Sequence, residues 1–321
     1  SSDVCSSDLL VVGSSNVDMI TTVSQFPQPG ETILAKSFSI RCGGKGLNQA
    51  VAIAKLVTDP TILSFVSSVG SDHNAQIIMD TLDRYHMTKD SLIVNSAYST
   101  GLTNICIDQN GENTIVVVPG ANVQLMPEQL HSPLFLQNCK IMVLQQEIPL
   151  STVKWLLRCC SERKIIAILN PAPASPDFTV DMEEFAFVNV LIPNETEAKL
   201  LTGMDEIDPC RAMDILTYKY PDMIVIITCG DKGAMVGRQS ERREIRCPHI
   251  VARDTVGAGD CFVGTFGYLV YQYLKENSFE NISMDQLGEI VQKCCNASSF
   301  SVQFEGGCDK YPRSEERRVG K

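Results

Sequence analysis

The sequence lacks the features that mark several common classes of protein. No stretch approaches the roughly 20 consecutive apolar residues that a bilayer-spanning helix needs. The first residues have neither a charged segment nor a long apolar core, so we expect no secretory signal and no membrane span. Lysine and arginine form no long run, and the net charge is −11. Nucleic acids and anionic membranes are bound through clustered basic residues, so neither is an expected partner.

Cysteine is abundant, but the patterns of metal sites and disulfide frameworks are missing. The 13 cysteines are an odd number, lie scattered along the chain, and include no C-x-x-C and no His/Cys spacing suited to zinc. They predict free thiols in a reducing compartment, that is, a cytoplasmic protein with access to the nucleus. The few histidines have no Ser or Cys nucleophile elbow beside them and are interpreted as surface or structural: His73, His86, His131 and His249.

The two ends of the chain differ in character from the rest. SSDVCSSDL (1–9) and RSEERRVGK (313–321) are short and polar and resemble translated adapter sequence. We expect both ends to be non-native. The remaining residues, 10–312, are enough for one large α/β domain with a sizeable core.

Apolar runs alternate with amphipathic segments over most of the chain. LLVVG (9–13), TILSFVSSVG (61–70), IMVLQ, IIAILN, FVNVLIP and MIVIIT are typical of buried strands, and the last four are each separated by a predicted helix. Helical spacing predicts helices over 46–57 and 75–87, after Asp260, and near 286–303. The pattern indicates a doubly wound α/β fold, a mostly parallel sheet flanked by helices.

Two β-rich segments, near 17–45 and 98–120, interrupt this alternation. The second holds two apolar runs joined by an Asn-Gly pair, which predicts a hairpin. We expect the two segments to pair into a small sheet at one edge of the domain. It is either a lid over a binding site or a side decoration.

Polar residues follow the predicted strands at the point where each one ends. Asn16 and Asp18 follow the first strand, and Glu147 and Asn194 follow two later ones. Ligands of doubly wound folds bind at the carboxyl ends of the strands. Polar residues at several such ends on one rim favour a binding site over ordinary loops.

The segment DTVGAGDCFVG (254–264) places Gly257, Ala258 and Gly259 before Asp260 at the start of a predicted helix. Backbone N–H groups at a helix N-terminus can bind a phosphate, and Asp260, expected to be ionised, can accept a proton from a hydroxyl. A plain Asp cap after a glycine turn explains the tetrad equally well. GGKGLNQA (43–50) is neither a Walker loop nor a dinucleotide fingerprint, and taken alone it indicates close packing as readily as binding.

Together these motifs resemble the ribokinase family of carbohydrate and nucleoside kinases, the phosphofructokinase-B type, over about Leu10 to Pro312. DTVGAGDCFVG is similar to the family's C-terminal signature and RCGGKGLNQAVA (41–52) to its N-terminal one, while NPAPA (170–174) and PNETEA (193–198) are similar to the ribokinase branch. The resemblance implies transfer of the γ-phosphate of ATP to the 5-hydroxyl of D-ribose. It also implies a homodimer formed through the lid.

The resemblance also implies roles for individual residues. Asp260 matches the catalytic base, and Gly257, Ala258 and Gly259 match the anion hole. The positions that match sugar-binding residues are Asn16, Asp18, Gly44, Lys45, Gly46, Asn48, Glu147 and Asp260. Those that match nucleotide contacts are Asn194, Thr228, Cys229, Gly230, Asp231, Lys232, Gly233, Gly259 and Asn296.

Two metal ions are implied by the same resemblance. Asn194 and Glu197 match an N-x-x-E element that helps to place Mg²⁺ through water. A monovalent cation, usually K⁺, is implied at Asp254, Val256, Ser301, Phe304, Gly306 and Lys310. The sequence departs from the family here, because Lys310 stands where a small hydroxyl residue is expected and Phe304-Glu305 replaces smaller residues. The Lys310 ammonium either competes with K⁺ or points to solvent.

The alternatives are another sugar or nucleoside kinase of the same family, and a catalytically silent relative that binds a sugar or nucleotide as a regulator. The silent relative would be favoured by loss of the base or the anion hole, and both are intact in this sequence.

Overall fold

The computed structural model describes residues 7–130 and 136–314, and the predicted non-native ends and His131 lie largely or wholly outside them. Within these residues the apolar runs form one central sheet. Its strands are β1 (Leu9–Val12), β4 (Leu63–Val69), β5 (Leu92–Val94), β8 (Ile141–Leu144), β9 (Ile166–Leu169), β10 (Val190–Leu191), β11 (Ile224–Thr228), β12 (Ala234–Arg238) and β13 (Glu241–Ile245). The order across the sheet is β13-β12-β11-β10-β9-β8-β1-β4-β5.

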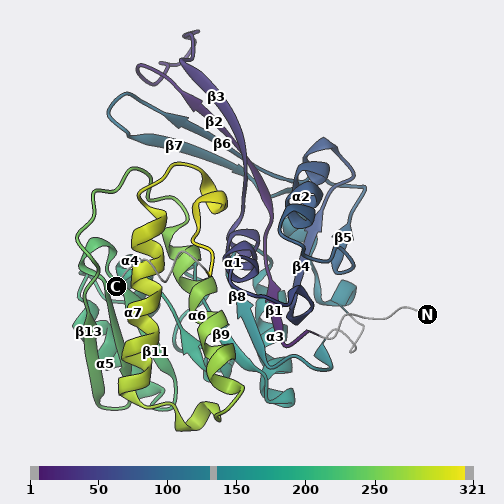
Figure 1. Cartoon of the computed structure of the whole chain (residues 1–321). Helices are drawn as coiled ribbons and strands as arrows, with labels where there is room; N and C mark the ends of the chain where they lie inside the picture. The colour runs from purple at the N-terminus through teal and green to yellow at the C-terminus, as the bar shows by residue number, and fades with distance from the viewer. Residues whose placement is uncertain (1–6, 131–135, 315–321) are drawn as a thin grey trace.

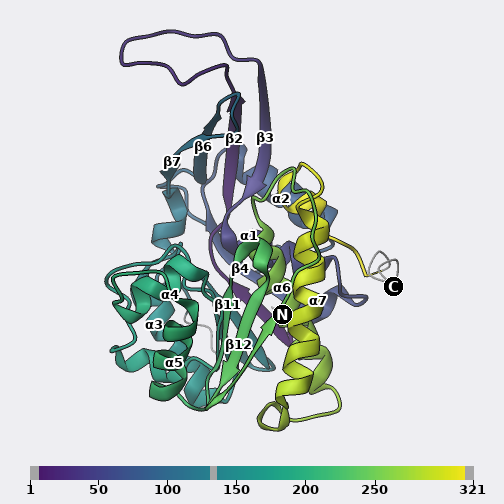
Figure 2. The same cartoon turned by 90° about the vertical axis from the view of Figure 1, so that its left-hand side faces the viewer.

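Helices cover both faces of this sheet, and each face has its own hydrophobic core. Along β1, Leu9 and Val11 face one core while Leu10 and Val12 face the other, as the two-residue period of a strand requires. The first core packs against α1 (Lys45–Ala54), α2 (His73–Arg84), α6 (Ala258–Leu274) and α7 (Met284–Ser301). The second packs against α3 (Leu150–Arg163), α4 (Glu195–Thr202) and α5 (Pro209–Lys219), on the opposite side of the sheet in Figure 2.

A second, four-stranded sheet projects from one end of this body (Figure 1). Its strands are β2 (Asn16–Thr22), β3 (Ser37–Gly43), β6 (Gly101–Ile107) and β7 (Asn113–Val118), in the order β3-β2-β6-β7. β2 and β6 pair in parallel, with Asn16 opposite Gly101, and β6 and β7 form the predicted hairpin. We call this sheet the lid. The doubly wound, mostly parallel fold with a small separate sheet is therefore confirmed.

Two details differ from the sequence predictions. The helix expected between β9 and β10 is absent; the connection is a loop with a short 3-10 helix over Glu183–Phe187. Pro171, Pro173 and Pro176 lie at its start, and proline cannot donate to a helical hydrogen bond. β12 and β13 form an antiparallel hairpin at one edge that was not predicted.

The helix boundaries follow local capping chemistry. α4 and α7 each begin with a capping box, formed by Asn194 with Glu197 and by Ser283 with Gln286. The helices predicted at 46–57, 75–87 and 286–303 are α1, α2 and α7, displaced by at most three residues. None of the described helices is both long and apolar enough to cross a membrane.

Gly46 is the point where α1 approaches the end of β1 most closely. A Cβ added there would lie 2.6 Å from the backbone carbon of Gly13 and 2.6 Å from the backbone nitrogen of Ser14. Because both neighbours are backbone atoms, neither can move aside by a side-chain rotation. Gly46 therefore acts in packing, and it sets the position of the α1 N-terminus.

We predict that Gly46→Ala lowers the free energy of unfolding by about 2 to 3 kcal/mol, because the added methyl forces α1 away from β1. Gly288→Ala is the matched control in α7, where the added Cβ would meet no atom closer than 3.7 Å. Because alanine has a higher helix propensity than glycine, the free energy of unfolding of Gly288→Ala should equal that of the wild type or exceed it by up to about 1 kcal/mol. Urea unfolding monitored by circular dichroism measures both, and equal stabilities for the two variants would contradict the packing role.

Candidate functional site

The predicted site lies where the N-termini of α1 and α6 meet at the carboxyl ends of the sheet strands. Asp260 is in the first turn of α6 and only 7% exposed. Its Oδ2 accepts a hydrogen bond from Asn48 Nδ2 at 3.0 Å, and its Oδ1 accepts one from Gln49 Nε2 at 3.0 Å. Both donors come from α1, so the two helices jointly fix both oxygens of the carboxylate.

Gln49 is a member of this site that sequence reasoning missed. Its side chain is fully buried and accepts a hydrogen bond from Gln145 Nε2 at 2.7 Å. Its own Nε2 also lies 3.2 Å from Asn170 Oδ1. Gln49 follows directly after Asn48 in the N-terminal motif, but nothing in the sequence indicated that its amide would be buried.

Burial and the neighbouring polar groups act in opposite directions on the pKa of Asp260. Burial raises the pKa of Asp260 above its ordinary value, while the Lys45 charge and the hydrogen bonds from Asn48 and Gln49 oppose the shift. For Lys45, burial alone would lower the pKa, but the carboxylates of Asp260, Glu147 and Glu197 outweigh it and the net direction is upward. The carboxylate and the ammonium therefore stabilise each other's charged form.

The lid supplies the second part of the site. Asn16 and Asp18 lie two residues apart on β2, so both point to the same face of the lid. Asn122, also missed from the sequence, donates its Nδ2 to Asn16 Oδ1 at 2.8 Å and accepts the N–H of Ser15 at 2.9 Å. Asn122 thereby fixes the orientation of the Asn16 amide.

Asp18 is an acid held in an unfavourable environment. Burial raises its pKa from 3.8 to about 6, the charge of Glu147 adds to the shift, and Thr103 and Arg41 oppose it. A Cβ at Gly43, on the neighbouring strand β3, would lie 2.1 Å from Asp18 Oδ2. Gly43 therefore leaves the room in which the Asp18 carboxylate lies.

Glu147 joins the main sheet to the N-terminus of α1. Its Oε2 accepts hydrogen bonds from Ser14 Oγ at 2.5 Å and from the backbone N–H of Lys45 at 2.9 Å. Gly44 is the N-cap residue, with a φ of 86°, a left-handed conformation that favours glycine. Glu147 thus acts as the capping carboxylate of α1 from 102 residues away in sequence.

A cavity of about 210 Å³ opens beside Asp260. Its lining residues come from both helices and from several strand ends: Lys45, Asn170, Ala172, Ile192, Asn194, Glu197, Thr228, Gly257, Gly259, Asp260 and Val263. The structure therefore brings the predicted base, anion-hole glycines, Lys45 and part of the predicted nucleotide set to one cavity.

The backbone of the loop before α6 lines the cavity at Gly257 and Gly259. Gly257 has a φ of 77°, and its carbonyl accepts a hydrogen bond from Tyr311 Oη at 2.9 Å. A Cβ at Gly259 would meet no atom within 4 Å, so this side of the helix start is open. The N–H of Ala258 already donates to the carbonyl of Thr255 at 3.2 Å. The N–H groups of Gly259 and Asp260 lie in the first helical turn, where no intrahelical acceptor is available.

The predicted Mg²⁺ position lies at the capping box of α4. Asn194 and Glu197 use one side-chain oxygen each in their capping box, at 2.8 Å in both directions. Burial raises the pKa of Glu197, while the Asn194 N–H and Lys45 oppose the shift. No cluster of three or more metal-ligating side chains occurs among the described residues. One free carboxylate oxygen in a cavity fits Mg²⁺, which commonly keeps its waters and binds through one or two carboxylates and phosphates.

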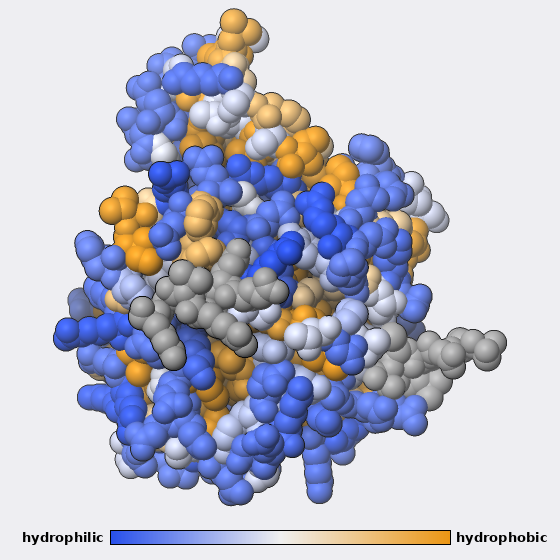
Figure 3. All heavy atoms as spheres, viewed as in Figure 1, coloured by the Kyte–Doolittle hydropathy of each residue, from blue (hydrophilic) through white to orange (hydrophobic). Residues whose placement is uncertain are grey.

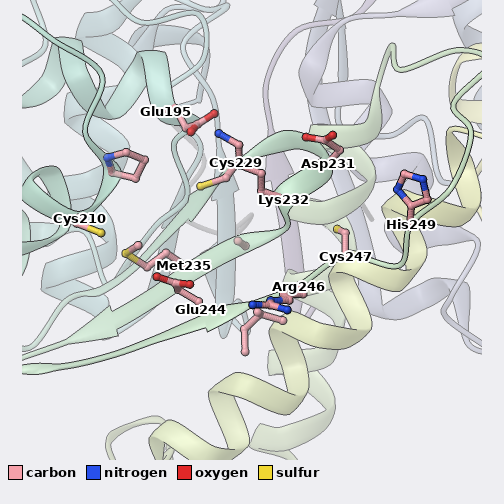
Figure 4. A pocket seen from close by; sticks show the side chains of 13 residues that line it. Glu195, Cys210, Cys229, Asp231, Lys232, Met235, Glu244, Arg246, Cys247 and His249 are labelled. Atoms are coloured by element: carbon pink, nitrogen blue, oxygen red, sulfur yellow. The ribbon is translucent and has the colours of Figure 1, made fainter.

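A second, larger cavity adjoins the first, and most of the other predicted nucleotide residues line it or lie in the same turn. Cys229, Asp231 and Lys232 line it, with Gly230 and Gly233 in the same turn. Figure 4 shows Asp231, Cys247 and His249 on one side of this cavity and Glu195 and Cys210 on the other. Neighbouring residues divide between the two cavities, since Asn194 and Thr228 line the first while Glu195 and Cys229 line the second. Asn296 lies on α7, exposed, and accepts from Gln292 Nε2 at 3.1 Å.

The positions predicted for a monovalent cation are only partly brought together. Phe304 is 46% exposed and packs on Phe300, and the Val256 side chain is also exposed. Ser301 Oγ donates to the Ser298 carbonyl at 2.8 Å. Lys310 does not point to solvent: its ammonium is buried, donates to the Asp254 carbonyl at 2.7 Å and lies 3.1 Å from Asp254 Oδ2. A K⁺ ion does not fit between these two oxygens while the ammonium is there.

We predict a pH-dependent gain in stability for Asp18→Asn. Because the folded pKa of Asp18, about 6, exceeds the unfolded value near 3.8, its contribution to stability is complete below pH 4 and is lost as the pH rises through 6. The variant should match the wild type at pH 4 and exceed it by about 3 kcal/mol at pH 7 to 8. Urea unfolding across this range measures the difference.

The exposed Asp205→Asn is the matched control for this series and should follow the wild-type pH profile. A stability difference between Asp18→Asn and wild type that stays constant from pH 4 to 8 would rule out the buried-charge explanation.

The comparisons with known proteins agree with this geometry. A family model described as pfkB family carbohydrate kinase matches residues 6–313. A deoxyribokinase of Salmonella typhi is 33% identical over 312 residues, covering 96% of this chain and 97% of that protein. A ribokinase of Staphylococcus aureus is 31% identical over 315 residues, covering 96% and 97%. The structure of Arabidopsis thaliana ribokinase complexed with ribose and ATP superposes with a TM-score of 0.83 at 27% identity, covering 98% of each chain. This chain therefore belongs to the pfkB family of carbohydrate kinases, as its motifs predicted.

Proposed function

We propose that this carbohydrate kinase transfers the γ-phosphoryl group of ATP to the 5-hydroxyl of D-ribose, giving ribose 5-phosphate and ADP. The observation that carries the proposal is the buried Asp260 carboxylate, held by two α1 amides beside an open helix N-terminus and the Lys45 ammonium. A carboxylate whose pKa is raised by burial is a stronger base toward a sugar hydroxyl than a carboxylate in water.

In the proposed step, the 5-hydroxyl oxygen bonds to the γ-phosphorus while the bond from that phosphorus to the β–γ bridging oxygen breaks. The hydroxyl proton passes to Asp260, and the electron pair of the broken bond leaves with ADP. The segment Gly257–Gly259 lies beside the phosphoryl group, and the backbone N–H groups of Gly259 and Asp260 at the start of α6 stabilise the charge on the equatorial phosphoryl oxygens. Asn48 and Gln49 hold the Asp260 oxygens in place during the transfer.

The sugar end of the proposed site combines acceptors and donors. Asn16, Asp18 and Glu147 offer oxygens, while Lys45 and Asn48 offer N–H groups that can donate to sugar hydroxyls. The relative from Salmonella typhi is named a deoxyribokinase, so 2-deoxyribose is the alternative substrate. A site whose buried polar groups pair with the 2-hydroxyl rejects the sugar that lacks it, because those groups would be left unpaired.

The nucleotide is proposed to span the two adjoining cavities. Its phosphates lie in the cavity beside Asp260, and its adenosine lies in the larger one, beyond Thr228 and Cys229. Glu197 and Asn194 would hold the hydrated Mg²⁺. When bound, Mg²⁺ neutralises phosphate charge and orients the β- and γ-phosphates.

A panel of acceptors tests the substrate. Purified protein with Mg-ATP is assayed for ADP release with D-ribose, 2-deoxy-D-ribose, D-fructose and adenosine. We expect the highest kcat/KM with ribose, at least about tenfold above 2-deoxyribose, which corresponds to about 1.4 kcal/mol. Equal or higher values with 2-deoxyribose or adenosine would reassign the substrate, and ADP release that no acceptor increases would overturn the sugar-kinase proposal.

Asp260→Asn is the catalytic variant in this panel. It keeps the size of the side chain but removes the base, so kcat should fall by at least about a thousandfold, the range of general base catalysis. Calorimetric titration with ribose checks that sugar binding persists. Substantial turnover by the variant would exclude Asp260 as the base.

We also propose that the chain forms a homodimer through the lid. β7 is exposed at every position, and Figure 3 shows hydrophobic side chains gathered over the lid. Directly paired residues share a face, so Ile20, Ile105 and Ile115 lie in one row on the face that carries Asp18. Ile115 is 53% exposed, and a second copy packed on this row would cover both the apolar side chains and the sugar end of the site.

Ile115→Glu tests the dimer. A carboxylate in an apolar interface should raise the dimer dissociation constant at least about tenfold. Val116→Glu is the matched control, because Val116 is 62% exposed but lies on the opposite face of β7. Sedimentation velocity over a concentration series measures both. A monomeric wild type, or equal effects of the two variants, would contradict an interface on the Asp18 face.

A further inference from the structure

Lys310 is a buried cation in the segment that follows α7. Its side chain is 1% exposed, in the 3-10 helix η8 (Gly307–Lys310). Its Nζ donates to the main-chain carbonyl of Asp254 at 2.7 Å and lies 3.1 Å from Oδ2 of the same residue. One residue therefore supplies both a carbonyl and a carboxylate oxygen to the ammonium.

Asp254 also fixes the polypeptide around it. Its Oδ1 accepts the N–H of Val256 at 3.0 Å, and its Oδ2 accepts the N–H of Gly306 at 3.4 Å. Arg41 Nη1, from lid strand β3, lies 3.6 Å from the same Oδ2. Burial lowers the pKa of Lys310, and its contact with Asp254 opposes that shift.

The loop held in this way is the one that leads into the anion hole. Asp254 precedes Gly257 by three residues, and Tyr311, next to Lys310, donates to the Gly257 carbonyl at 2.9 Å. Consecutive residues of one short segment thus bind the beginning and the end of loop 254–257. A change of charge at Lys310 would therefore shift the backbone of Gly257, although Lys310 itself would not contact a substrate.

We propose that the Lys310 ammonium is a built-in monovalent cation that replaces an exchangeable K⁺ beside the anion hole. The ammonium has the same charge as K⁺ and lies within hydrogen-bonding distance of two Asp254 oxygens. It therefore occupies the space that an added ion would need, and it already neutralises the Asp254 carboxylate. Lys310 is a positioning residue that acts through loop 254–257. The proposal rests on the proposed kinase function for its effect on rate, but not for its effect on ion binding.

The first consequence is that the wild-type rate does not depend on the identity of the salt. Phosphoryl transfer with Mg-ATP is measured in KCl, NaCl and choline chloride at equal ionic strength. We expect rates that agree within about twofold. Strong activation by K⁺ in the wild type would overturn the proposal.

Lys310→Ser is the informative variant, because it removes the ammonium, leaves a space and adds a hydroxyl oxygen. We expect its kcat to fall at least about tenfold in NaCl and to recover in KCl. Lys310→Met is the matched control: it removes the charge but fills the space, so KCl should not restore its rate. Recovery of kcat in KCl by Lys310→Ser, but not by Lys310→Met, would show that Lys310 acts as a positioning cation and not only in packing. A Lys310→Ser variant with the same rate in both salts would also overturn the proposal.

Thermal unfolding supplies a readout that needs no catalysis. We expect the Tm of Lys310→Ser to rise in KCl relative to NaCl at equal ionic strength, and the Tm of the wild type and of Lys310→Met to stay unchanged. A wild-type Tm that rises specifically in KCl shows an exchangeable site and refutes the proposal, even if Lys310→Ser fails to fold. If no sugar is phosphorylated, the kinase proposal fails while these Tm measurements still decide the cation.

Discussion

The site depends on one physical constraint, the placement of the Asp260 carboxylate in the interior. A buried charge is costly unless it is hydrogen-bonded and paired. Asn48 and Gln49 of α1 satisfy its two oxygens, which requires α1 and α6 to lie very close together. Gly264 of α6 makes this approach feasible, since a Cβ there would lie 2.5 Å from the Gln49 carbonyl. The close packing of α1 against α6 therefore also positions the proposed base, Asp260.

Residues of the lid interact both with the carboxylates of the candidate site and with the loop before α6. Asp18 on β2 lies near enough to Glu147 and Asp260 for each of them to raise its pKa. Arg41 on β3 lies 3.6 Å from Asp254, at the start of loop 254–257. Asp18 is thus an acid kept in a place that disfavours its charge. At the proposed sugar site, hydroxyl groups that donate to Asp18 would stabilise its charged form and so offset part of the cost of its burial.

Much of the fold, and which segments meet at the candidate site, could be predicted because the relevant signals are local. Buried strands, capped helices and the Asn-Gly hairpin follow from side-chain period and turn chemistry within short windows. The predicted helix between β9 and β10 was wrong because the proline-rich start of that segment outweighs its composition. Two buried amides were missed, those of Gln49 and Asn122, because a buried amide has no distinctive sequence pattern until its partners are known.

The sequence by itself determined the doubly wound sheet, the separate lid, the glycine-rich start of α6 and the family of kinases to which the chain belongs. Only the tertiary structure decided which oxygens and ammonium groups meet, because those contacts join residues far apart in the chain. Asn48 and Asp260 are separated by 212 positions, and Lys310 and Asp254 by 56. The sequence left Lys310 either facing solvent or competing with K⁺. Packing buried its ammonium against Asp254, because a buried cation must find an anion and this one lies beside it.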